Sequence, residues 1–163
     1  MPAKPKPASP FDAAEALMTA FATNNRINLY LIQHLPNEAW RATPPNGKGR
    51  TIGAIAAHIH NVRLMWLKSA GGQIPAKLDV DTATKAEAAA ALEDSFAALD
   101  SLIRADLATD GRIKGFKPDV CSFLAYLFAH EGHHRGQMSM LARQTAFPLP
   151  QSAMFGLWEW GTR

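Results

Sequence analysis

Three histidines lie close together near the end of the chain: His130, His133 and His134. At about 100° per residue, His130 and His134 fall within roughly 60° of Leu127 on a helix, and His133 falls about 120° away. Two imidazoles one helical turn apart can bind one metal ion, because their ring nitrogens can converge at the roughly 2 Å of a zinc–nitrogen bond. The alternative is a pair of core histidines hydrogen-bonded to neighbouring side chains.

The helix that must carry these histidines is predicted to extend from Asp119 to Thr145. This stretch contains no proline, and Asp119, just after Pro118, is placed to cap its N-terminus. Apolar residues recur along it at three- and four-residue steps and form one stripe: Val120, Phe123, Leu124, Leu127, Met138 and Leu141. The stripe predicts a face that packs into a core, so His130 and His134 are expected to point inward.

A third metal ligand would have to come from another helix, and His58 and His60 lie on one. Thr51 is placed to cap that helix, which is predicted to end at Gly71-Gly72. His58 and His60 are about 200° apart around the helix axis, so they cannot both face one site. His60 shares its side of the helix with three other residues: Ala56, Arg63 and Leu67. Periodicity alone favours His58 only slightly.

Two further helices complete the expected fold. The first is predicted from Ser9, as its N-cap, to about Leu35, and the other from the Thr84 to Glu87 capping box to about Ala108. Residues 36–50 are expected to form a loop, with Trp40 anchored in the core. Four helices of roughly 19 to 27 residues and no convincing strand predict an all-α four-helix bundle, a fold whose core commonly carries metal sites.

The chain of 163 residues is predicted to form one domain. Residues 1–8 are expected to be a disordered tail, residues 9–163 the bundle, and residues 146–163 an apolar C-terminal tail. The apolar side chains of that tail should pack on the bundle, against a second subunit or over a pocket: Met154, Phe155, Leu157, Trp158 and Trp160.

Composition and charge argue against several classes of partner. The net charge is only +3, and Lys4 and Lys6 of the N-terminal segment contribute to it, so a role in nucleic-acid binding is not supported. The apolar run at 123–129 is too short to span a bilayer, and the first ten residues lack the apolar segment of a signal peptide. A single cysteine excludes an internal disulfide. We therefore expect a cytoplasmic protein that binds neither nucleic acid nor membrane.

The middle of the first predicted helix is unusually polar, with Asn24, Asn25, Arg26 and Asn28 in five positions. The simplest interpretation is a solvated helix face. The alternative is that some of these side chains line a pocket.

The spacing of His130, Glu131 and His134 also satisfies H-E-x-x-H, the zinc-protease pattern in which the glutamate is the general base. The longer metzincin form requires glycine at position 137 and histidine at 140, where this chain has Gln137 and Met140. Those proteases also need strands, so the all-helical pattern disfavours a protease. Glu131 is still a candidate catalytic acid or base. The alternative is a buried partner of Arg135 or another cation.

The segment from His130 to Gln137, HEGHHRGQ, resembles the H-x-x-H-H-R-G-Q signature of the DinB/YfiT-like metal-dependent family. The stretch from Thr51 to Ile59, followed by Trp66-Leu67, is similar to that family's second helix. Helix number, order and length also match, so the resemblance covers residues 10–145. It implies that His58, His130 and His134 bind a divalent metal ion, zinc or nickel. The choice of His58 over His60 rests on the resemblance.

The resemblance further implies a homodimer and a metal-dependent enzyme that acts on a small-molecule substrate. Relatives are thiol-dependent transferases that use low-molecular-weight thiols, or are thought to be hydrolases. Three imidazoles leave coordination positions open for water or substrate, as catalytic sites do. Gln137 is placed to orient a ligand histidine through a hydrogen bond. Whether the chain is an enzyme stays open, and the alternative is a non-catalytic metal- or ligand-binding dimer.

Overall fold

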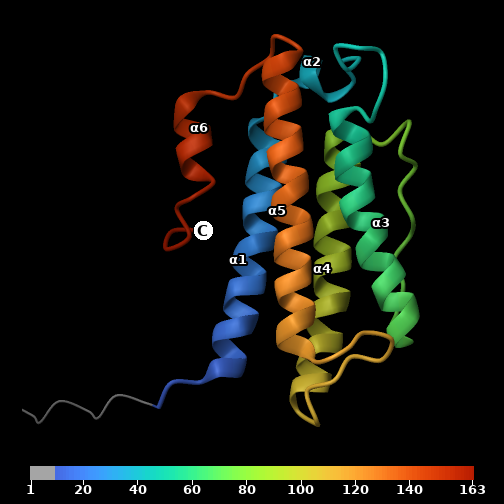
Figure 1. The fold of residues 1–163 in the computed structure, drawn as a ribbon, viewed down its shortest axis with the longest axis vertical. Coiled ribbons are helices and arrows are strands. Elements are labelled where there is room, and N and C mark those ends of the chain that lie inside the picture. The colour runs from blue at the N-terminus through green and yellow to red at the C-terminus, as the bar shows by residue number, and fades with distance from the viewer. Residues whose placement is uncertain (1–9) are drawn as a thin grey trace, which may run out of the picture.

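A computed structural model describes residues 10–163, and four long helices form a bundle in this part of the chain (Figure 1). They are α1 (Ala13–His34), α3 (Ile52–Ala70), α4 (Lys85–Leu107) and α5 (Val120–Gln144), and two short helices, α2 (Asn37–Trp40) and α6 (Gln151–Gly156), accompany them. The predicted all-α bundle is confirmed. Within residues 10–163, no helix combines the length and hydropathy needed to cross a bilayer.

The long helices run in two directions. Figure 1 shows α1 and α5 running one way and α3 and α4 the other, because residues 71–84 return along the length of α3 before α4 begins. The side chain of Asn61 on α3 forms two hydrogen bonds with the backbone of Leu78 in this returning segment. Its Nδ2 donates to the Leu78 carbonyl at 2.9 Å, and its Oδ1 accepts from the Leu78 N–H at 3.1 Å. As a result α3 and α5, which carry the histidines, are antiparallel.

Most predicted helix ends are confirmed by their capping interactions. The Thr51 and Asp119 side chains accept from the N–H groups of Ala54 and Ser122, Thr84 and Glu87 form the reciprocal capping box, and Gly71 ends α3 in the left-handed conformation at φ 82°. The start of α1 differs from its prediction. The predicted cap Ser9 and the predicted tail 1–8 lie outside the described residues, and the helix begins later, with Asp12 as its N-cap.

The bundle interior has two apolar clusters. One lies around Leu31, Ile59 and Met138, and the other around Phe21, Leu67 and Phe123. Between them, the four long helices contribute buried polar side chains that hydrogen bonds join: Asn24, Asn25 and Asn28 from α1, Arg63 from α3, Ser95 from α4, and Glu131 from α5. The core is therefore divided by a polar layer.

The predicted anchor at Trp40 is confirmed. Its side chain is 4% exposed, and its indole N–H donates to the Ala83 carbonyl at 2.9 Å. The ring lies so close to Gly53 that an added Cβ would approach its nitrogen to 2.7 Å, which is why a glycine is required there. The short helix α2, whose last residue is this anchor, was not predicted.

The C-terminal tail does not bury the aromatic side chains that were expected to pack on the bundle. The buried residues of α6 are Ala153 and Gly156, while Phe155 and Trp158 are 64% and 79% exposed. A cavity of about 730 Å³ lies between this tail and α5, and Phe155 and Trp158 are among its lining residues. Of the three positions predicted for these side chains, packing over a pocket agrees with the structure, and packing against a second subunit stays a prediction.

Candidate metal centre

The structure brings His58 of α3 together with His130 and His134 of α5. One ring nitrogen from each of the three side chains lies within 4.8 Å of the other two. The ring centre of His58 is 5.4 Å from that of His130 and 4.8 Å from that of His134. The three residues that the family resemblance singled out therefore face one point between α3 and α5.

The remaining histidines near this point do not join the group. His60 is fully buried on another side of α3, where its Nε2 lies 2.9 Å from the Ala76 carbonyl of the returning segment 71–84. His133 is exposed. Both placements agree with the angular predictions, since His60 is two residues from His58 and His133 is one residue from His134.

The geometry of the α5 pair is compatible with one metal ion. The Nε2 atoms of His130 and His134 are 3.1 Å apart. Two nitrogen ligands of a tetrahedral zinc ion, at bonds of about 2.05 Å, are roughly 3.3 Å apart, so this pair needs almost no movement. The wider spread of 4.8 Å over the whole group means that one ring, most simply that of His58, must rotate to complete the coordination.

Gln137 determines which nitrogen of His134 faces the group. Its Oε1 lies 2.8 Å from the His134 Nδ1, as predicted for a residue that orients a ligand histidine. Because an amide oxygen only accepts, Nδ1 must carry the hydrogen, and the lone pair is left on Nε2. The Nδ1 of His130 is buried and has no hydrogen-bond partner among the described residues. The two histidines of the pair are thus held to different degrees.

The histidines of the group are neutral near pH 7. Burial, the positive charge of Arg50 and the neighbouring His134 and His130 lower the pKa of His58 to about 4. Burial also lowers the pKa of His130 and His134, although the hydrogen bond to Gln137 opposes this shift at His134. Since only the neutral imidazole has a lone pair to donate, this is the protonation state that metal binding requires.

Glu131, the candidate acid or base, is fully buried in the polar layer. Its Oε1 accepts from Arg63 Nε at 2.8 Å and its Oε2 from Arg63 Nη2 at 2.9 Å, while Asn24 and Asn28 each donate to Oε2 at 2.6 Å. Burial alone would raise the pKa of Glu131, but the charge and hydrogen bonds of Arg63 outweigh it and hold the pKa below its usual range. The structure thus gives Glu131 a buried cationic partner, and a catalytic role for it stays a prediction.

The sequence left the cationic partner of Glu131 open, as Arg135 or another cation, and the structure identifies it. The salt bridge is made by Arg63 and not by Arg135, whose Nη1 donates to the side-chain oxygens of Asn24 and Asn28 at 2.8 and 2.6 Å. The prediction that the asparagines of α1 form a solvated face is wrong, because Asn24 and Asn28 are 0% exposed. Their amides complete the hydrogen bonding of Glu131 and supply the acceptors for Arg135.

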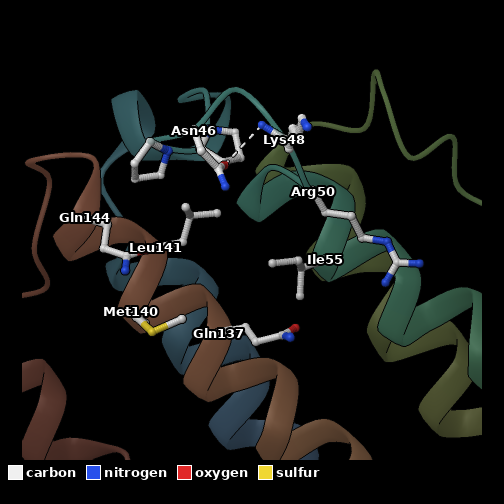
Figure 2. Close-up of a pocket in the computed structure, with 10 residues that line it drawn as sticks. Asn46, Lys48, Arg50, Ile55, Gln137, Met140, Leu141 and Gln144 are labelled. Carbon is white, nitrogen blue, oxygen red and sulfur yellow. Dashed lines mark hydrogen bonds between the residues drawn. The ribbon is translucent and has the colours of Figure 1, made fainter.

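A cavity of about 590 Å³ lies beside the histidines, between the loop at 41–50 and α5 (Figure 2). Figure 2 shows Ile55 of α3 and Gln137 and Leu141 of α5 around one space, with Asn46 and Lys48 on the loop above it. Gln137 belongs to both sites, since it lines the cavity and contacts His134. None of the three histidines lines the cavity, so Gln137 is the residue that connects it with the histidine group.

Comparison with known proteins agrees with the motif. A family model described as the DinB family matches residues 10–152. The match includes the four long helices and all three histidines of the group. Searches among curated proteins and among solved structures each found no match.

Proposed function

We propose that this chain, which belongs to the DinB family, binds one divalent metal ion through His58, His130 and His134. The observation that carries the proposal is the convergence of three ring nitrogens from two antiparallel helices. Two features support it further: the rings are neutral near pH 7, and Gln137 leaves the lone pair of His134 on the nitrogen that faces the group. Imidazole ligands suit zinc and nickel, and these are the metals we propose.

We propose further that the metal centre is catalytic and that the reaction is a thiol-dependent transfer or a hydrolysis of a small molecule. Such a metal ion, when bound, lowers the pKa of a coordinated water or thiol and polarises a carbonyl group. The chain itself would bind the substrate in the cavity beside Gln137 and hold His134 in one orientation. A low-molecular-weight thiol is the co-substrate that we propose for the transfer reaction.

The alternative is a metal- or ligand-binding dimer without catalysis. The group of three imidazoles favours the enzyme, since structural metal sites are closed by four protein ligands whereas catalytic sites keep a position for substrate. The homodimer and the cytoplasmic location stay predictions of the sequence.

The first experiment is elemental analysis of the purified chain without a polyhistidine tag. We expect about one zinc or nickel ion per chain, and loss of that ion in His58→Ala and His134→Ala. His60→Ala and His133→Ala are the matched controls, because each removes a neighbouring imidazole that does not face the group. Circular dichroism would verify that every variant is folded. A folded wild-type chain without metal, even after incubation with zinc and with nickel, would overturn the proposal.

A further inference from the structure

We infer that the cavity beside the histidines selects small molecules that combine a negatively charged group with an apolar body. The inference deepens the proposed function, on which it rests for the reaction that would follow binding. The selecting charges, however, belong to the chain and not to the metal ion. The preference can therefore be measured whether or not a metal is bound.

The charged residues that line the cavity are both cations, Lys48 and Arg50, and no acidic residue lines it. Both are exposed, and neither forms a salt bridge within residues 10–163. Within residues 10–163, four arginines do have acidic partners: Arg63, Arg104, Arg112 and Arg163. The cavity thus contains two positive charges that are not neutralised by the protein, and an anion can supply the missing partner.

The rest of the lining is mainly apolar, with three side chains that can form hydrogen bonds. The apolar residues are Pro44, Pro45, Ile55, Met140 and Leu141, and the uncharged polar ones are Asn46, Gln137 and Gln144. A volume of about 590 Å³ lies within the usual range for small-molecule sites. Such a surface binds an apolar body through burial and leaves orientation to a few polar contacts.

The two cations of the lining and its residues on α5 come from different elements. Lys48 and Arg50 precede α3, whereas Gln137, Met140 and Leu141 project from α5 (Figure 2). A ligand whose anionic group contacts the loop residues can therefore extend its apolar body over Ile55 and Leu141. Its far end then lies at Gln137, which contacts His134.

The test uses two probes of nearly equal shape, 2-naphthoate and its neutral amide, 2-naphthamide. Isothermal titration calorimetry would measure the Kd of each probe for the metal-free and for the zinc-loaded full chain at low salt. Exposed charge pairs contribute up to about fivefold each, so we expect the metal-free chain to bind the naphthoate about five- to tenfold more tightly than the amide. The difference should shrink as the salt concentration rises.

The variant Lys48→Gln/Arg50→Gln should lose most of this preference while its Kd for the amide stays the same. The control is Lys68→Gln, which removes one exposed positive charge from the other end of α3, about 15 Å from His58 along the helix, and should keep the preference. Neither cavity substitution breaks a salt bridge or a side-chain hydrogen bond of the described residues, so folding should be unaffected.

Four outcomes would overturn the inference, and the first three concern the metal-free chain. These three are failure of the metal-free chain to bind the naphthoate, equal binding of the two probes, and a preference that survives in the double variant. A preference seen only with zinc would also overturn it, since the metal ion would then be binding the carboxylate. Failure of the chain to bind any metal would contradict the proposed function but would leave the metal-free comparison decisive for the cavity.

Discussion

Two clusters of polar side chains meet on α5, and they differ in how completely their polar atoms are hydrogen-bonded. Glu131 is enclosed, and both of its oxygens accept hydrogen bonds from α1 and α3. His130, the next residue, belongs to a group that is partly open, and its Nδ1 has no partner among the described residues. In the first cluster hydrogen bonding is complete, which is typical of a structural element, whereas the second keeps free lone pairs. Adjacent residues of one helix thus differ in how completely their side chains are hydrogen-bonded.

The enclosed cluster also positions the open one. Arg63 and His58 lie on α3, and Glu131 and His130 lie on α5, so the bidentate salt bridge joins the same two helices that carry the histidines. Arg63 is tied to α1 and α4 as well, through the Asn25 side chain and the Leu92 carbonyl at 2.9 Å each. We therefore expect a substitution in this network to affect the histidine group as well. A substitution in the histidine group should have only a local effect.

The largest effect is expected from Arg63→Leu. It would leave the Glu131 carboxylate buried without its cation, which typically costs about 3–5 kcal/mol of the free energy of unfolding. Denaturant unfolding monitored by circular dichroism would measure the loss. The control is Arg112→Leu, since Arg112 forms a 3.9 Å pair with Asp110 and is 76% exposed, and we expect almost no change there. Equal effects of the two substitutions would remove the distinction between the clusters.

A smaller effect is expected from Gln137→Leu, and on a different property. Loss of the hydrogen bond to His134 Nδ1 frees the ring to adopt the other tautomer, and such losses typically weaken metal binding about 10- to 100-fold. Competition with a chromophoric chelator would measure the zinc affinity. The free energy of unfolding of the metal-free variant should barely change, because Gln137 is only partly buried. A large loss of stability with unchanged affinity would make Gln137 part of the structural cluster instead.

The smallest effect on stability is expected from a change of pH. The two clusters should lose stability in different pH ranges. The pKa of His58 is about 4 in the folded chain against an ordinary value of 6.5, so the unfolded chain binds more protons between these values. Stability of the metal-free chain is therefore complete above about pH 6.5 and declines as the pH falls toward 4, although exposure to solvent reduces the loss. Denaturant unfolding at a series of pH values should show a shallower decline for His58→Gln.

Glu131 should also make the chain less stable as the pH falls, but in a lower pH range than His58. Its folded-state pKa lies below the usual 4.5, so its contribution to stability is present above that value and is lost as the pH falls further. The His58→Gln variant should retain this second loss in full. If the substitution also removed the loss below pH 4.5, the two clusters would be one titrating unit.

Much of the fold could be predicted because its signals are local. Thr51, Asp119 and the Thr84 to Glu87 box act on residues within one turn, and Gly71 ends α3 by its own conformation. The start of α1 was the exception, since Ser9-Pro10 and Asp12 both fit a helix start and the cap is Asp12. The short helices α2 and α6 were missed because they occupy proline-rich segments.

The candidate site was only partly predictable. The angle between His130 and His134 follows from helical geometry, but the choice between His58 and His60 needed the family motif. The pairing of Arg63 with Glu131 joins two helices that are distant in sequence, so no local pattern reveals it. A signal did exist: Arg63 shares a side of α3 with Ala56 and Leu67, which are both fully buried. A charge on that side requires partners, and the polar middle of α1 supplies them.

The anchoring of Trp40 affects how the substrate range of such a protein can change during evolution. The indole is fixed against Gly53 and hydrogen-bonded to Ala83, and Thr51 fixes the start of α3. The loop at 41–50 is therefore held at both ends, while Lys48 and Arg50 between them are exposed. Substitutions in such a loop alter a binding wall at little cost to folding. Mutation and selection could thus change what the cavity accepts while the three histidines stay as they are.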